Sequence, residues 1–287
     1  GLIYKGNRLV NWCPLSKSAI SDEEVIHKEK NGKLWHFSYP VKGTEDYLIV
    51  ATTRPETMLG DTAVAVNPND NRYKSYIGKT VILPLVGREI PIIADDYVDP
   101  DFGTGCVKVT PAHDPNDFLM GERHNLEFIN IMNEDASMNS KVPKKYQNLP
   151  RESAREAVLS DMDSDKKLHK VEDYAHNVGY SERGNVPIEF YLSEQWYLKM
   201  DELANPALKA VNSQEIKFYP NHWTKTYNHW INNIRDWCIS RQLWWGHQIP
   251  VWYHKNDIKK IHVSIDGPKD PQNWIQDKDV LDTWASS

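Results

Sequence analysis

The sequence predicts an α+β protein: a β-rich body shaped as a curled sheet or barrel, helices flanking it, and a C-terminal part of different character. From Tyr47 to Met132, short apolar or alternating runs are separated by Gly, Pro, Asn or Asp, a pattern typical of strands joined by turns. Later stretches show the helical spacing of apolar residues. Most of the 11 tryptophans follow residue 222, which indicates that the chain is a composite.

The elements of the body can be placed individually. The expected strands are the runs LIVATT, TAVAVN, TVILPLV, IPIIA and CVKVT. One helix is expected to start near Asp114, and another covers PRESAREAVLSDM, residues 150–162. Further on, SEQWYLKMDELANPALKAV is expected to form a helix that begins with Ser193 as its N-cap and breaks near Pro206.

Composition and charge exclude several classes of protein. With 287 residues, 40% of them hydrophobic, the chain can bury a real core. Its formal charge of -6 provides no overall basic field, so any nucleic acid must be held locally. No apolar run approaches the roughly 20 residues of a membrane span, and the 3 cysteines form no C-x-x-C pair, which favours reduced thiols in a cytoplasmic protein. Both ends of the sequence read as interior parts of a longer chain.

The stretch GTGCVKVTPAHDPND, residues 103–117, gathers polar groups at the end of a predicted strand. One interpretation is structural: Asp114 caps a helix, with a proline in its first position and Asp117 in its first turn. Capping does not explain Lys108 and Thr110, which lie two residues apart and therefore on one face of the strand. The other interpretation is a small-molecule pocket that offers an ammonium, a hydroxyl and two carboxylates to a ligand carrying an amine and a hydroxyl.

Three further features are candidates for the same chemistry. Thr52, Thr53 and Arg54 end an apolar strand, where they either satisfy a turn or bind a phosphate or carbonyl oxygen. His113 is either a general base or a structurally packed histidine. The basic segment 141–155 is either a solvated loop leading into a helix or a phosphate contact.

The combination of ATTRPET with GTGCVKVTPAHDPND, some fifty residues later, closely resembles the editing insertion of the class I valyl-tRNA synthetases. The segment LVNWCPLSKSAISDEEV resembles the entry into this insertion in the valyl, isoleucyl and leucyl enzymes. The segments RDWCISRQLWWGHQIPVWY and DVLDTWASS resemble the catalytic-domain segments that follow it. Within the trio, KVTPAHDPND and GERHNLE are similar to the valyl version. The resemblance covers essentially the whole chain.

The resemblance implies the hydrolysis of tRNA(Val) mischarged with threonine. Valine and threonine are nearly isosteric, and an apolar pocket in valyl enzymes is known to reject the extra hydroxyl only about 100-fold, so a second site must read it. By similarity to the family, the α-ammonium is anchored by Asp114, and the hydroxyl is contacted or framed by Asp117, Lys108 and Thr110. The remaining assignments place Phe102 against the terminal adenosine, His113 in the substrate pocket, and Thr52, Thr53 and Arg54 on the ester and nearby phosphate or ribose.

The resemblance also implies a domain organisation. Residues 1–212 form the editing insertion, with a stem near 1–40 and 186–212 and a β-rich body at about 44–185. Residues 213–287 form a partial α/β, Rossmann-like segment of the second half of the catalytic domain. In the parent enzyme, Trp245, Asp279, Val280 and Trp284 belong to the valine-activating site; from the residues alone, Trp244 and Trp245 are equally well explained as core aromatics.

The expected activity is limited to editing. The H-I-G-H and K-M-S-K-S signatures are not found in the sequence, so ATP and Mg are implied only for the full-length parent, and aminoacylation is not expected of this chain. The implied partners are the 3′ end of tRNA(Val) carrying threonine and the remaining synthetase domains, with no membrane. Two alternatives stay open: a non-catalytic module that docks the tRNA 3′ end, and a free-standing hydrolase of other amino-acid esters.

The segment SERGNVPIE, residues 181–189, yields a testable prediction about metal content. Some relatives carry zinc-binding cysteines here, whereas this segment contains none. We therefore expect no structural zinc and no cofactor for editing. Elemental analysis of the purified chain should find far less than one zinc per molecule; a stoichiometric amount would overturn the prediction.

Overall fold

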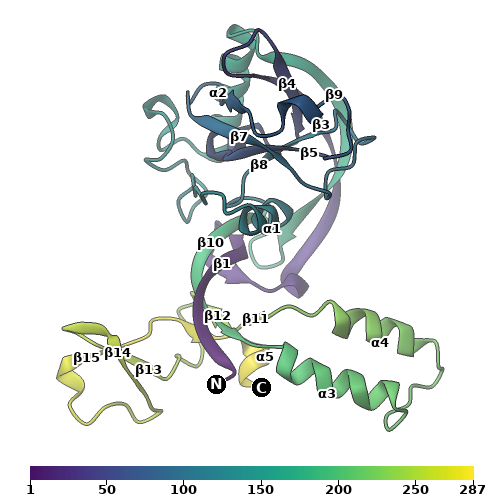
Figure 1. Cartoon of the computed structure of the whole chain (residues 1–287). Coiled ribbons are helices and arrows are strands. Elements are labelled where there is room, and N and C mark those ends of the chain that lie inside the picture. The colour runs from purple at the N-terminus through teal and green to yellow at the C-terminus, as the bar shows by residue number, and fades with distance from the viewer. The chain divides into compact units, whose positions relative to one another are not determined.

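The computed structural model describes residues 1–287 and contains two compact units (Figure 1). One unit is Leu9–Leu192, and the other combines Gly1–Arg8 with Ser193–Ser287. Strands β1 (Ile3–Cys13) and β10 (Glu189–Leu198) carry the chain from one unit to the other. No helix combines the length and the apolar character needed to cross a membrane.

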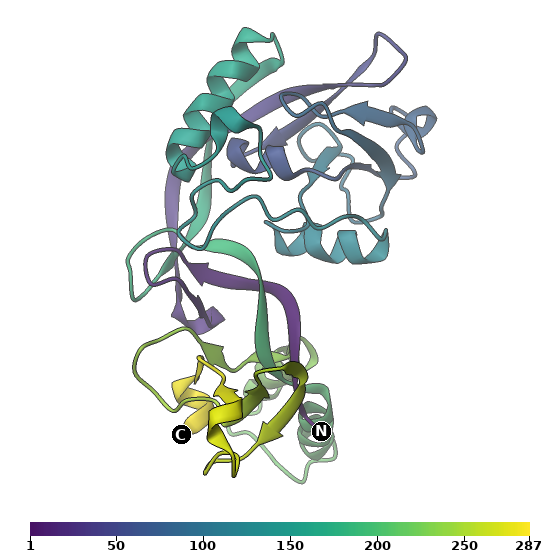
Figure 2. The same ribbon diagram turned by 90° about the vertical axis from the view of Figure 1, so that its left-hand side faces the viewer.

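The first sheet of the Leu9–Leu192 unit is built on a long antiparallel ladder. Strand β3 (Val25–Pro40) lies between β4 (Tyr47–Thr52) and β9 (Leu168–Ser181). The pairing of β3 with β9 runs from Val25 opposite Ser181 to Phe37 opposite Leu168, with a bulge between His36 and Phe37. Figure 2 shows these two long strands side by side, in purple and teal. The predicted run LIVATT is confirmed as β4. The sequence did not predict β3 and β9, because much of both strands is charged and exposed and lacks a buried alternate face.

The second sheet contains the other predicted strands, in the order β6, β7, β5, β8. All four expected runs are confirmed: β5 (Ala63–Val66), β6 (Thr80–Ile82), β7 (Glu89–Ala94) and β8 (Cys106–Val109). Strands β5 and β7 are parallel, and the other neighbours are antiparallel.

Of the two expected shapes, a curled sheet or a barrel, a closed barrel is not present. The two sheets meet at the isolated bridge between Val41 and Val81. A barrel requires continuous hydrogen bonding around its circumference. The strand that would continue the closure, β6, is only 3 residues long and ends just before a turn that contains Pro84. Closure therefore stops at one bridge, and the body is an open arrangement of two sheets.

The core of this unit lies between the two sheets. It contains Phe37 and Val50 from the first sheet, Val64 and Ile92 from the second, and Val158 from a flanking helix. Both predicted helices are confirmed: α1 (Pro115–Arg123) contacts β8, and α2 (Arg151–Ser164) contacts β9 and the 3-10 segment η2 (Pro55–Gly60). The remaining short elements are β2 (Ser18–Ile20), η1 (Asp22–Glu24), η3 (Lys74–Tyr76) and η4 (Lys144–Tyr146).

The helix expected to begin at Ser193 begins later. Ser193 lies inside β10, where the aromatic run FYLSEQWYL favours an extended strand. Helix α3 (Asp201–Asn212) follows and continues through Pro206, so the predicted break is also wrong. Pro206 is exposed in the middle of the helix, so water can bond the carbonyl that loses its partner. Helix α4 (Trp223–Asn232) packs against α3.

The remainder of the second unit is antiparallel rather than Rossmann-like. Its elements form a sheet β14-β13-β15 and a pair β12-β16, and β11 pairs with β10 at the edge of a 4-stranded sheet of order β11-β10-β1-β2. Parallel strands need a crossover of about a dozen residues, usually a helix, whereas β13 and β14 are joined by a tight turn. The bounds are β11 (Trp237–Cys238), β12 (Ser240–Arg241), β13 (Val251–His254), β14 (Asp257–Val263), η5 (Pro271–Asn273), β15 (Trp274–Gln276), β16 (Val280–Leu281) and α5 (Thr283–Ser286).

The core assignment predicts a contrast between two leucines of the same unit. Leu48 is 1% exposed inside the main cluster, whereas Leu119 on α1 is 43% exposed. Leu48→Ala should lower the free energy of unfolding by about 2–5 kcal/mol, because it leaves a cavity. Leu119→Ala should change it by less than about 0.5 kcal/mol. Thermal unfolding followed by circular dichroism measures both; equal effects would contradict the assignment.

Candidate functional site

The floor of the candidate site is formed at the end of β8. Lys108 and Thr110 lie on one face, as their spacing predicts, and the Lys108 ammonium donates to Oγ1 of Thr110 at 2.5 Å. Both residues are buried. Residues of β8 pair with β5, Lys108 opposite Val64, so the main core sheet fixes their positions. The strand ends where the amide of His113 donates back to the Thr110 carbonyl in a turn.

Asp61 is a site residue that the sequence reasoning missed. Its carboxylate is fully buried and accepts from the Thr110 hydroxyl at 2.6 Å, from Lys108 Nζ at 3.3 Å and from the Tyr39 hydroxyl at 2.7 Å. Burial raises the pKa of Asp61, and the charge of Lys108 opposes this effect. The one signal in the sequence is an acid placed in the apolar run MLGDTAVAV.

The bonds around Lys108 decide which groups remain for a ligand. Its ammonium donates to Asp61, to Thr110 and, at 3.2 Å, to the Thr57 hydroxyl, which are as many partners as an ammonium has hydrogens. The Thr110 hydroxyl donates to Asp61 and accepts from Lys108, so one lone pair is left. Within the floor, Thr110 can therefore accept one more hydrogen bond, while Lys108 is committed to the protein.

The two predicted carboxylates lie together at the start of α1. Asp114 caps the helix: its Oδ1 accepts from the amides of Asn116 at 2.8 Å and Asp117 at 3.1 Å. Asp117 is buried, and its Oδ2 accepts from the Thr110 amide at 2.8 Å. Burial raises the pKa of Asp117 to about 7, and the neighbouring charge of Asp114 adds to this shift. The cap interpretation is thus confirmed, and the same residues meet the floor.

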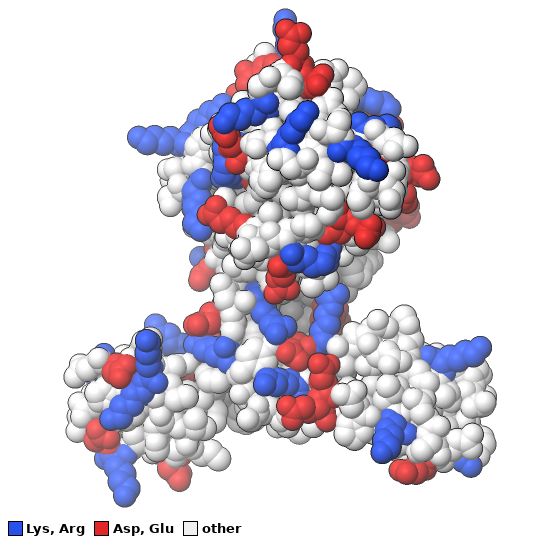
Figure 3. Space-filling model, in the orientation of Figure 1, with Lys and Arg blue, Asp and Glu red and all other residues white.

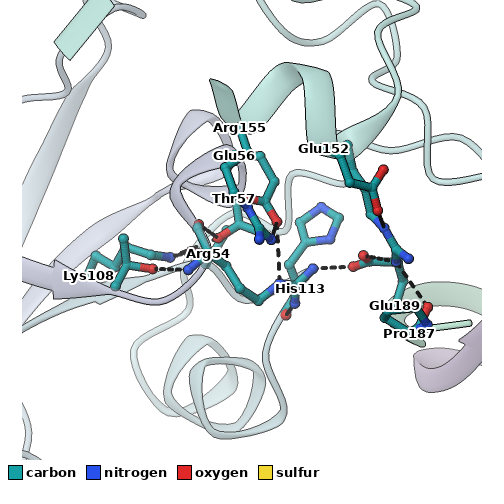
Figure 4. Close-up of polar contacts among 12 residues, drawn as sticks. Arg54, Glu56, Thr57, Lys108, His113, Glu152, Arg155, Pro187 and Glu189 are labelled. Atoms are coloured by element: carbon teal, nitrogen blue, oxygen red, sulfur yellow. Dashed lines mark hydrogen bonds and ion pairs between the residues drawn. The ribbon is translucent and has the colours of Figure 1, made fainter. Parts of the chain in front are cut away.

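Arg54 joins the second predicted segment to the first. Thr52, at the end of β4, accepts from the Arg54 amide at 3.0 Å, and Thr53 is partly exposed. The Arg54 guanidinium donates through Nη1 to the carbonyl of His113 at 3.0 Å and through Nη2 to Glu189 (Figure 4). Two segments some sixty residues apart are therefore connected directly at this side chain.

His113 is built into the structure. Its ring is buried, and its Nε2 accepts from the amide of Ile131 at 3.0 Å. Burial lowers the pKa of His113 to about 3, and the positive charges of Arg54 and Lys108 contribute. The imidazole is therefore neutral near pH 7, and its Nε2 lone pair is already used. These contacts match the interpretation of a packed histidine and leave Nε2 unable to act as a general base.

Phe102 lies on the exposed turn that precedes β8. Its side chain is 64% exposed. The turn is held by Arg72, which donates to the carbonyl of Pro100 at 2.6 Å, and by Tyr73, which donates to that of Thr104 at 2.7 Å. Gly105 has φ +73°, and a Cβ there would meet Arg72 at 2.5 Å, so this position requires glycine.

The predicted valine-site residues differ in exposure. Trp245 and Trp284 are 83% and 76% exposed, and Trp244 is 95% exposed, so the interpretation of Trp244 and Trp245 as core aromatics is wrong. Val280 is buried in β16 opposite Arg241. The neighbouring Asp279 accepts from Gln242 at 2.8 Å, and burial raises its pKa.

Neither the visible surface charge nor the cysteines mark a separate site. On the face in Figure 3, acidic and basic side chains are interspersed. All 3 cysteines are free thiols. No cluster of three or more His, Cys, Asp or Glu side chains is placed to hold a metal ion.

Residues 1–273 match the family profile of the class I tRNA synthetases for isoleucine, leucine, methionine and valine. The chain belongs to this family. The whole of this synthetase chain is 57% identical to a valine–tRNA ligase of Clostridium tetani and 54% identical to those of Bacillus licheniformis and Bacillus subtilis. It spans about a third of their length, 33% in the first case and 32% in the other two.

The buried Asp117 predicts a pH-dependent stability. Its pKa is about 7 in the folded synthetase chain, against the ordinary 3.8 of an aspartate in water, so the folded state binds its proton more tightly. The stabilisation that this proton confers is present at low pH and is lost as the pH rises from about 4 to 7. Asp117→Asn keeps an acceptor for the Thr110 amide and removes the titration.

We expect the free energy of unfolding of the wild type, minus that of Asp117→Asn, to fall by about 1–4 kcal/mol between about pH 4.5 and 7.5. Urea denaturation at several pH values measures it. Subtraction removes the contributions of Asp61 and of His113, whose pKa shifts have opposite directions and are shared by both proteins. A difference that stays constant or rises with pH would contradict the assignment.

Proposed function

We propose that this chain carries the editing site of a valine–tRNA ligase, which hydrolyses threonyl-tRNA(Val) and spares valyl-tRNA(Val). The observation that carries the proposal is the Thr110 hydroxyl: its donor is committed to Asp61, one lone pair is committed to Lys108, and one acceptor position remains. A threonine hydroxyl can donate there, whereas the corresponding methyl group of valine leaves buried polar groups unpaired. The similarity to valine–tRNA ligases over the whole chain supports the choice of tRNA.

The other site residues fit the same substrate. Asp114, partly exposed and using Oδ1 for the helix cap, offers its carboxylate to the α-ammonium. Asp117 lies beside the substrate hydroxyl. Thr52, Thr53 and Arg54 hold the ester and the ribose or phosphate of the terminal nucleotide, and Phe102 lies against the adenosine. In this proposal Lys108 acts by holding Thr110 and Asp61.

The reaction needs no protein nucleophile. Water attacks the ester carbonyl, the tetrahedral intermediate collapses, and the bond to the ribose oxygen breaks; this oxygen takes a proton and leaves as the hydroxyl of the tRNA end, while threonine leaves as the acid. His113 has its Nε2 occupied, so hydroxyl groups of the substrate or of the tRNA are the groups proposed to help activate the aligned water. The protein contributes position and stabilisation of the oxyanion. Editing requires no cofactor in this proposal; ATP and Mg serve the complete ligase.

The proposal is tested by deacylation of threonyl-tRNA(Val) and valyl-tRNA(Val) with the 287-residue chain and two variants of Asp114. Asp114→Asn keeps a good N-cap but removes the charge that pairs with the ammonium, so its kcat/KM on the threonyl ester should fall about tenfold or more at an unchanged Tm. Asp114→Ala should lose the same activity and, in addition, about 1 kcal/mol of stability.

Each contrary result has a definite meaning. Full activity in Asp114→Asn would show that the ammonium is not bound there. Equal hydrolysis of both esters would identify a hydrolase without threonine specificity. Binding of the tRNA end without hydrolysis of either ester would identify a docking module.

A further inference from the structure

Five charged side chains form a chain of ion pairs of alternating sign through Arg54: Arg151, Glu189, Arg54, Glu56 and Arg155. Figure 4 labels all of them except Arg151. One carboxylate oxygen of Glu189 accepts a hydrogen bond from Arg151 Nη1 at 2.6 Å, and the other accepts one from Arg54 Nη2. Glu56 receives Arg155 on both oxygens, at 2.7 and 2.8 Å. The acids are 3% and 0% exposed, so both would be costly to bury without these partners.

The chain of ion pairs connects elements that are distant in the sequence. Arg151 is the first residue of α2, Glu56 lies in η2, and Glu189 is the first residue of β10. Arg54 contacts η2 through Glu56 and β10 through Glu189, and these two acids connect it to α2. Its Nη1 donates to the carbonyl of His113, one residue before Asp114. The Arg54 guanidinium therefore links the Thr52–Thr53 segment to the backbone just before the helix cap at Asp114.

Of the two acids, Glu189 is the one that determines this orientation. Glu56 accepts from Arg155 on both of its oxygens and lies 3.7 Å from Arg54 Nε, which is an ion-pair contact and too long for a good hydrogen bond. Glu189 instead directs one carboxylate oxygen at Arg54, while Arg151 holds the other oxygen. The Arg54 side chain is still 27% exposed, so it retains donors for an oxygen of the substrate.

We propose that Glu189 is a positioning residue of the hydrolytic site, acting through Arg54 to hold the Thr52–Thr53 segment and the His113–Asp114 segment at their working distance. The effect on catalysis rests on the proposed function, whereas the role of Glu189 in holding Arg54 does not. A glutamine in this position has one oxygen and one amide donor, so it can serve only one of the two arginines and presents N–H groups to the other.

The chain offers a matched control. Glu152 also binds Arg151, through Nε at 2.8 Å, but its side chain is 67% exposed and it has no contact with Arg54 among the ion pairs. Glu189→Gln should lower kcat/KM for threonyl-tRNA(Val) about tenfold or more, whereas Glu152→Gln should change it less than twofold. Assays are run well below the lowest Tm of the set, so that loss of folded protein does not contribute.

A double-mutant cycle separates positioning from general destabilisation. In an Arg54→Ala background, adding Glu189→Gln should cost less than a further twofold, because the residue through which it acts is gone. If Glu189→Gln alone stays within twofold of the wild type, or if its full effect persists without Arg54, the inference is wrong.

A second measurement does not depend on activity. In nitrogen-detected NMR, with the Arg54 signals assigned by their loss in Arg54→Lys, the wild type and Glu152→Gln should show separate, slowly rotating Nη groups. Glu189→Gln should show averaged ones. Unchanged Arg54 signals in Glu189→Gln would overturn the inference even if the wild type edits. A wild type that does not edit, combined with the expected NMR change, would overturn the proposed function while supporting the role of Glu189 in holding Arg54.

Discussion

The burial of one carboxylate, that of Asp61, organises the candidate site. A charge removed from water is tolerable only when it is paired and fully hydrogen-bonded. Asp61 meets this condition by taking hydrogen bonds from Tyr39, Lys108 and Thr110, which come from different strands or strand ends. Each donor is thereby fixed in direction as well as in position, so the polar floor is preorganised before any ligand arrives.

Two parts of the rest of the unit hold the candidate site in place. The open two-sheet core fixes β8 and thus the backbone of Lys108, while the alternating ion pairs around Arg54 fix the loop after β4. Both parts contain buried acids that are paired with cations: Asp61 with Lys108 in the floor, and Glu189 and Glu56 with arginines at the loop. Asp114 lies where they meet, because Arg54 holds the carbonyl just before it.

The sequence could predict what is local. Spacing alone placed Lys108 and Thr110 on one face, and capping rules placed Asp114 at the start of α1. It could not find Asp61 or Glu189, because a single buried acid has no periodicity, and the partners that identify these two lie far along the chain, Lys108 47 residues from Asp61 and Arg54 135 residues from Glu189. The helix expected from Ser193 failed because strand-favouring aromatics determined the local structure, and the barrel failed because closure is a property of the whole sheet.

The direction of the hydrogen bonds within the floor restricts which ligand groups it can bind. The Thr110 hydroxyl already donates its hydrogen to Asp61, so a ligand group that bonds to it must be a donor. Asp117, whose pKa of about 7 leaves it partly protonated near neutrality, can accept or donate beside it. In the proposed function, the threonine hydroxyl donates to Thr110 and accepts from a protonated Asp117, whereas the methyl group of valine can do neither. In the proposed function, threonine is therefore distinguished from valine by two hydrogen bonds of its hydroxyl more than by the size of the pocket. Size cannot separate the two amino acids, because they are nearly isosteric.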